Sequence, residues 1–202
     1  MITDVCRLND NANDPNVALD QVERCAAYVG LEKKQSLQLR LLAEEALGMA
    51  RGMLGSFEAE FWIEANGKDF KIYLDMNADI DAEKREDLIG ISTGRENEAT
   101  KGVMGKLRRM IEFALYGDND TTAKYITSSI FAPESIMGSS SDIGALYTWS
   151  LVDYMNQVKL EKEVNIEKWD ELEKSTVAKL ADDVKVSVYV HRVKMVISKS
   201  FK

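Results

Sequence analysis

Residues 38–55 read QLRLLAEEALGMARGMLG, and residues 57–75 read FEAEFWIEANGKDFKIYLD. In the first stretch, leucines and methionines recur at helical spacing around a central Glu-Glu pair, which predicts an amphipathic helix. In the second stretch, apolar and polar residues nearly alternate on both sides of Asn66-Gly67, a dipeptide typical of tight hairpin turns. The order predicts one helix followed directly by a two-stranded hairpin whose second strand ends on Asp75.

The flanking sequence supplies further elements of the same kind. Asp14-Pro15 predicts the start of a helix with an apolar face over residues 17–29, and Gly30 predicts its end. Ser36 is the expected N-cap of the next helix. Residues 184–190 and 193–201 alternate like a second hairpin. Because hairpins favour antiparallel pairing, we expect an α+β fold, a two-layer sandwich with helices packed on one face of a mostly antiparallel sheet.

Residues 1–202 are expected to form a single domain. Residues 1–8 are a predicted short edge strand. Residues 116–180 are expected to be a helical insertion before the last two strands, with helices over 145–160 and 166–180. His191 is the only histidine of the chain, which excludes a multi-histidine metal site.

Composition narrows the classes of partner. The chain is 45% hydrophobic and 30% charged, and its formal net charge is −8. This acidic balance disfavours nucleic acid and anionic membranes as partners, since both require a basic surface. The sequence contains no apolar run of the roughly 20 residues that span a bilayer, and the N-terminal residues do not resemble a signal peptide. Cys6 and Cys25 are expected to be reduced thiols of a cytoplasmic protein.

The carboxylates of the central stretch are the first candidates for chemistry. Glu44 and Glu45 point about 100° apart on a helix, so only one of them can face a given site. Such a glutamate is either an ordinary residue at the solvent boundary or a general base that orients water. Asp75 ends a predicted strand, and Gly102 and Gly105 open the predicted helix that follows. Free N–H groups at a helix start can bind phosphate.

The order of these features resembles the nucleotide-binding part of the GHKL superfamily of histidine-kinase-like ATPases, most closely the bacterial anti-sigma-factor serine kinases. The resemblance covers about residues 17–115 and the final strands. It implies that Glu45 is the catalytic base and that Asp75 binds the adenine of ATP or ADP, with Asn77 replacing a family glycine. It further implies that Gly102, Gly105 and Lys106 accommodate the phosphates. For Asp75, capping of the strand end is the equal alternative.

Two residues depart from the family pattern. Met49 occupies the position of the asparagine that holds Mg²⁺, and a thioether is a poor ligand for that hard cation. Asp79 adds a negative charge near the expected phosphates. We therefore expect an ATP-binding regulatory protein with weak or no hydrolysis that acts through a protein partner. The alternative is a non-catalytic protein-interaction module of the same fold, a pseudo-ATPase. Whether the chain is an enzyme and whether it forms a homodimer stay open.

Overall fold

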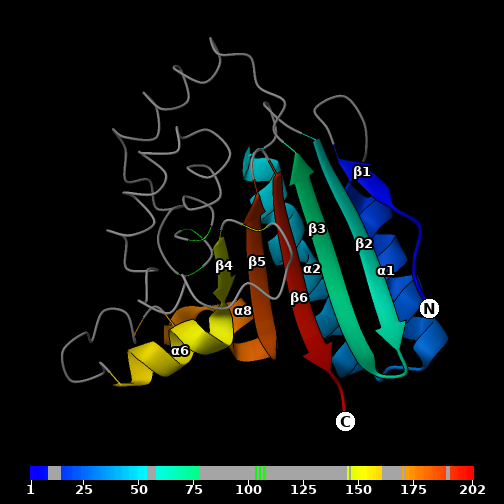
Figure 1. Cartoon of the computed structure of the whole chain (residues 1–202). Coiled ribbons are helices and arrows are strands. Elements are labelled where there is room, and N and C mark those ends of the chain that lie inside the picture. Colours follow the sequence, from blue (N-terminus) through cyan, green and yellow to red (C-terminus); the bar gives the residue numbers. More distant parts are fainter. Residues whose placement is uncertain are drawn as a thin grey trace.

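An antiparallel β-sheet is the centre of the fold, with helices packed against it (Figure 1). The predicted α+β class is confirmed. The computed structural model describes residues 1–8, 15–53, 58–77, 103, 105, 107, 145, 147–160, 170, 172–189 and 192–202.

Six strands of the described residues form this sheet, in the order β1-β2-β3-β6-β5-β4. Each pair of neighbouring strands in this order is antiparallel. From one edge to the other, the strands are β1 (Cys6–Leu8), β2 (Glu58–Asn66), β3 (Asp69–Asn77), β6 (Arg192–Ser200), β5 (Asp183–Tyr189) and β4 (Tyr147–Ser150).

Two consecutive helices, α1 (Pro15–Val29) and α2 (Lys33–Met53), cover one face of the sheet and lie behind it in Figure 1. Helix α1 begins at the predicted proline and is followed by Gly30, whose φ of 76° ends it. The prediction of Ser36 as the next N-cap is wrong, because α2 already begins at Lys33. There the backbone N–H of Glu32 donates to Gln35 Oε1 at 3.1 Å, half of a capping-box arrangement.

The predicted β2–β3 hairpin forms, but its loop lies one residue later than the predicted Asn66-Gly67. Asn66 pairs with Asp69, so the loop consists of Gly67 and Lys68. Gly67 has a φ of 60°, a conformation that glycine adopts without steric cost. The hairpin register places residues that alternate along each strand on opposite faces of the sheet.

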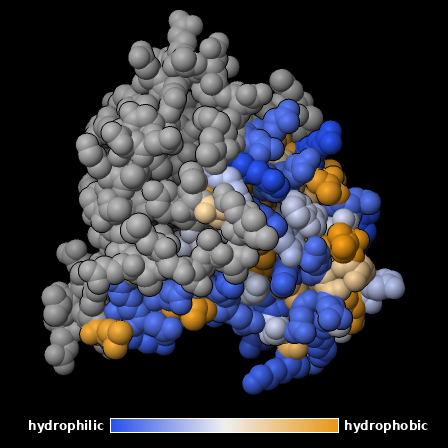
Figure 2. Space-filling model, viewed as in Figure 1, coloured by the Kyte–Doolittle hydropathy of each residue, from blue (hydrophilic) through white to orange (hydrophobic). Residues whose placement is uncertain are grey.

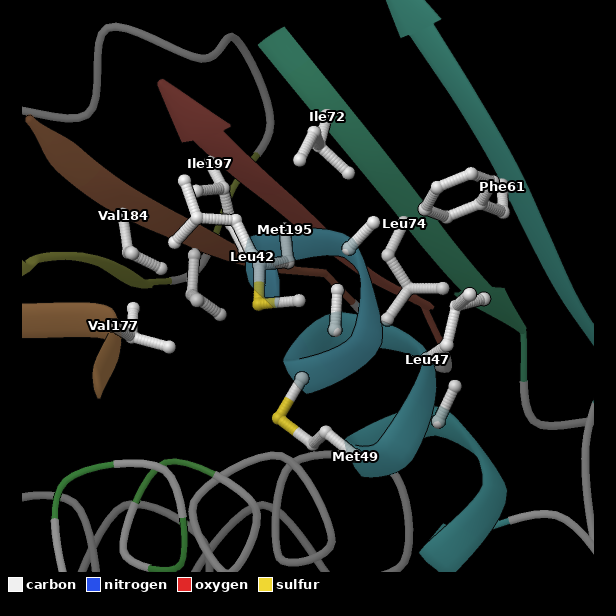
Figure 3. Close-up of a cluster of buried hydrophobic side chains, with 14 of the residues drawn as sticks. Leu42, Leu47, Met49, Phe61, Ile72, Leu74, Val177, Val184, Met195 and Ile197 are labelled. Carbon is white, nitrogen blue, oxygen red and sulfur yellow. The ribbon is translucent and has the colours of Figure 1, made fainter. Parts of the chain in front are cut away.

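The apolar core lies between the sheet and α2 (Figure 3). Leu42, Leu47 and Met49 of α2 lie in this buried cluster. Each strand contributes every second residue to this core, and these side chains are almost fully buried. They are Phe61, Ile63, Ile72, Leu74, Met76, Val184, Val186, Met195 and Ile197. The alternation therefore separates an inner face, which packs on the helices, from an outer face, which points away from α1 and α2.

The described part of the insertion differs from its prediction in detail. Residues 145–160 were expected to be a helix, but Tyr147–Ser150 form the edge strand β4 and only Leu151–Leu160 form helix α6. β4 pairs with β5, so tertiary pairing overrides the local helical pattern. The helix expected over 166–180 is interrupted at Ser175, which caps α8 (Thr176–Leu180) by accepting from the Ala178 N–H.

The N-terminal segment carries an extra residue against β2. Ile2 pairs with Glu64, and Cys6 pairs with Phe61. Between these two pairs the N-terminal segment has three residues and β2 has two, so the extra residue forms a β-bulge. Gln21 of α1 donates a hydrogen bond to the Asp4 carbonyl beside this bulge and accepts one from Cys6 Sγ at 3.0 Å. The contacts fix the edge strand to the helix layer.

No helix in the described part of the chain combines the length and the apolar character needed to cross a membrane.

Candidate functional site

Glu45 lies on α2, on the helix side of the sheet, and its side chain is half-buried. One turn further on, Met49 is only 6% exposed and belongs to the apolar core (Figure 3). The position at which the family resemblance expects a metal-binding asparagine is therefore filled by a core side chain. Its thioether supplies packing rather than an oxygen ligand.

Asp75 lies on the outer face of the sheet. Its neighbours Leu74 and Met76 are fully buried on the inner face, so the alternation of the strand points Asp75 the other way. The sheet consequently separates Asp75 from Glu45, and these two residues do not line one cleft. The sequence prediction had placed both at a single nucleotide site, and the structure does not bring them together.

The Asp75 carboxylate has a cationic partner. Arg192 donates from Nε to Oδ1 at 2.8 Å and from Nη2 to Oδ2 at 2.5 Å. The Asp75 side chain is 7% exposed, whereas that of Arg192 is 52% exposed. These hydrogen bonds and the adjacent negative charge raise the pKa of Arg192 above its ordinary value. The fork of two parallel bonds fixes the guanidinium in one orientation on the outer face.

The structure describes two of the remaining predicted site residues, Asn77 and Gly105. Asn77 is the exposed last residue of β3, and it pairs with Glu58 on one side and Arg192 on the other. Gly105 is helical and buried, as are Val103 and Leu107, which belong to the core. Gly102 and Lys106 lie outside the described residues, and so does Asp79.

A stacked aromatic pair lies on the outer face, opposite the helices. Trp62 of β2 and Tyr73 of β3 are direct partners in the hairpin register. Their ring centroids are 4.8 Å apart and their planes differ by 2°. Such a stack adds about 0.5–1.5 kcal/mol beyond the burial of its area. The pairing follows from the observed loop of Gly67 and Lys68, because a loop of Asn66 and Gly67 would have placed Trp62 opposite Lys71 instead.

Tyr73 has a neighbour on each side of its ring. Trp62 comes from β2, and the Lys194 ammonium from β6 lies 5.5 Å from the ring centroid. Because β3 runs between those two strands, the two neighbours cover opposite faces of the phenol ring. The hydroxyl donates to Glu64 Oε2 at 2.9 Å. Burial, together with this hydrogen bond and the charge of Glu64, raises the pKa of Tyr73 to about 12.

Charge is distributed unevenly over the outer face. β2 presents Glu58, Glu60 and Glu64 there, whereas β6 presents Arg192 and Lys194. Figure 2 shows this side of the molecule, with hydrophilic residues in blue beside paler and orange ones. An acidic strand and a basic strand thus lie on either side of β3.

Within the described residues, no cluster of three or more His, Cys, Asp or Glu side chains is placed to hold a metal ion. No protein-family model, no curated protein and no solved structure matches the chain. The outer face brings aromatic, cationic and anionic side chains together on neighbouring strands.

Proposed function

We propose that this chain is a non-catalytic protein-interaction module that contacts its partner through the outer face of β2, β3 and β6. The observation that carries the proposal is the Trp62–Tyr73 stack on that face, bordered by fixed charges. Tryptophan, tyrosine and arginine are the residues most enriched at the energetic centres of protein interfaces. Trp62, Tyr73 and Arg192 supply all three within adjacent strands.

The ring geometry favours a protein over a base or a sugar as the bound partner. Nucleobases and sugars stack on an accessible aromatic face. Tyr73 has Trp62 on one face and Lys194 on the other, so it presents its edge instead. A net charge of −8 also disfavours a nucleic-acid backbone. Apolar and charged side chains of a protein fit such an edge.

Adenine-nucleotide binding stays a prediction. Glu45 is the predicted site residue on which this function can be tested, because its side chain is half-buried on the helix side of the sheet and is partly accessible to a ligand. The separation of Glu45 from Asp75 by the sheet and the burial of Met49 favour the interaction module instead. The resemblance to anti-sigma-factor kinases extends the proposal to a regulatory protein of the bacterial cytoplasm, and the free thiols of Cys6 and Cys25 agree with a reducing compartment.

A photoreactive amino acid at position 62 tests the proposed surface. We expect it to cross-link the full chain to a protein partner in the cell, whereas the same group at position 28 does not. Tyr28 is the matched control because it is an aromatic residue, 79% exposed, on the helix side. Equal cross-linking from both positions, or none from position 62, would contradict the proposal.

Calorimetric titration with ATP and ADP, each with and without Mg²⁺, tests the competing function. The interaction module predicts no heat at millimolar nucleotide. Micromolar binding that is lost in Glu45→Gln but retained in the neighbouring Glu44→Gln would establish a nucleotide site on the helix side and overturn the proposal that the chain is only a protein-interaction module.

A further inference from the structure

We infer that the partner of the outer face is a second copy of this chain, packed face to face about a two-fold axis that runs along β3. This inference rests on the proposed function, since it names the partner of the same surface. The argument comes from the pattern of charge on the face. Opposite charges face each other when the two-fold axis runs along β3, whereas like charges face each other when the axis runs perpendicular to the strands.

The strand registers define four rows that cross the outer face. Each row contains one residue of β2, its partner on β3 and the next partner on β6. The rows are Glu58–Asn77–Arg192, Glu60–Asp75–Lys194, Trp62–Tyr73–Val196 and Glu64–Lys71–Ser198. β2 and β6 are therefore equidistant from β3 in every row.

A two-fold axis along β3 leaves each row in place and exchanges its two ends. β2 of one copy then faces β6 of the other. By strand position, Glu60, which pairs with Arg7 in its own copy, lies opposite the second copy's Lys194. Glu58 lies opposite the second copy's Arg192, whose guanidinium reaches toward Asp75, and Trp62 lies opposite the second copy's Val196. Each of these contacts occurs twice. Sheets pack in this way with their strands nearly aligned and about 10 Å apart.

An axis in the same plane but perpendicular to the strands would place β2 on β2. Glu58, Glu60 and Glu64 would then face the same acidic strand of the other copy, and like charges facing each other across an interface repel. The charge pattern therefore selects the axis along β3.

The residues on the axis are compatible with this packing. Tyr73 meets its own copy edge to edge, beside Trp62. Asp75 also faces its own copy, but its negative charge is already neutralised by the two hydrogen bonds from Arg192. Lys71 is exposed, and its long side chain can extend into solvent.

Sedimentation equilibrium of the full chain over a range of concentrations tests the inference. We expect a monomer–dimer equilibrium that shifts toward monomer as salt is raised. Glu60→Lys and Lys194→Glu should each weaken the dimer about tenfold or more, because each places like charges face to face at two symmetric positions. Trp62→Ala should weaken it by a similar factor.

Mixing the two charge variants separates an interface from a folding defect. The Glu60→Lys variant has lysine at positions 60 and 194, and the Lys194→Glu variant has glutamate at both of these positions. In a heterodimer of the two variants each lysine faces a glutamate, so an equimolar mixture should form a heterodimer of near wild-type affinity. Variants that merely misfold would not rescue each other. Asp20→Lys and Lys34→Glu make the same changes in net charge at exposed positions of α1 and α2, and should leave the dimer intact.

A wild-type chain that stays monomeric at every concentration would overturn the inference. A dimer that survives Trp62→Ala, or a charge-variant mixture that stays monomeric, would overturn it as well. The proposed function would be judged separately in these cases. Cross-linking from position 62 to a different protein would support the interaction module while removing the second copy as its partner.

Discussion

Asp75 and Arg192 form a two-bond ion pair between β3 and β6, 117 positions apart in the sequence. The carboxylate is buried, and the guanidinium reaches from it to the surface. The pair links the two central strands of the sheet and occupies the aspartate that the sequence had suggested for adenine recognition.

Removing the cation from this pair should destabilise the fold. In Arg192→Ala the Asp75 carboxylate is left buried without its fork of donors, so we expect the free energy of unfolding to fall by about 2 kcal/mol. Urea denaturation measures the change. Arg7→Ala is the control, since Arg7 is 79% exposed and lies 3.4 Å from Glu60. Arg7→Ala should lower the free energy of unfolding by less than about 1 kcal/mol. Equal effects would show that burial of Asp75 contributes nothing.

Tyr73 should make stability depend on alkaline pH. Its pKa is raised from 10.0 to about 12 in the folded chain by burial and Glu64. Below pH 10, Tyr73 is protonated in both the folded and the unfolded chain, and its full contribution to the free energy of unfolding is present. As the pH rises toward 12, the unfolded chain ionises first, and this contribution is lost. Urea unfolding of the wild type and of Tyr73→Phe across this range measures it.

Tyr73→Phe should lose about 1 kcal/mol below pH 10 through the missing hydrogen bond to Glu64. This deficit should shrink at higher pH, because phenylalanine cannot ionise. A deficit that stays constant up to pH 12 would argue against a raised pKa at this residue.

Two glycines should respond in opposite ways to the same substitution. Gly48 is an exposed residue within α2, and an added Cβ meets no atom within 4 Å. Gly48→Ala should therefore stabilise the chain by about 0.5–1 kcal/mol through helix propensity. Gly67 has equally open space but a φ of 60°. Gly67→Ala should destabilise the chain by about 1 kcal/mol. Thermal unfolding of both variants compares them directly, and shifts of the same sign would refute the backbone argument.

The two thiols should differ in reactivity. Burial raises the pKa of both Cys6 and Cys25, which lowers their thiolate content. Cys25 is 1% exposed, whereas Cys6 is half-exposed at the edge of the sheet. A disulfide reagent should modify Cys6 slowly in the folded chain and Cys25 only after unfolding. Cys6→Ser should abolish the slow native phase, and a phase that persists in this variant would show that Cys25 is accessible.

Much of the fold was readable from local patterns. The helical spacing of apolar residues predicted α1 and α2, and period-two alternation predicted both hairpins. The outward direction of Asp75 was also encoded, because Leu74 and Met76 flank it with residues that must face the core. The nucleotide hypothesis followed the order of motifs along the chain and did not apply this alternation.

The sequence by itself determined α1, α2, both hairpins and the face on which each hairpin residue lies, because periodicity is a local property. Only the tertiary structure decided that β6 lies beside β3, since antiparallel pairing between distant segments depends on the whole core. That neighbour relation brings Arg192 to Asp75 and Lys194 to Tyr73. It also converted residues 147–150 into an edge strand, because hydrogen bonds to β5 outweighed their helical pattern.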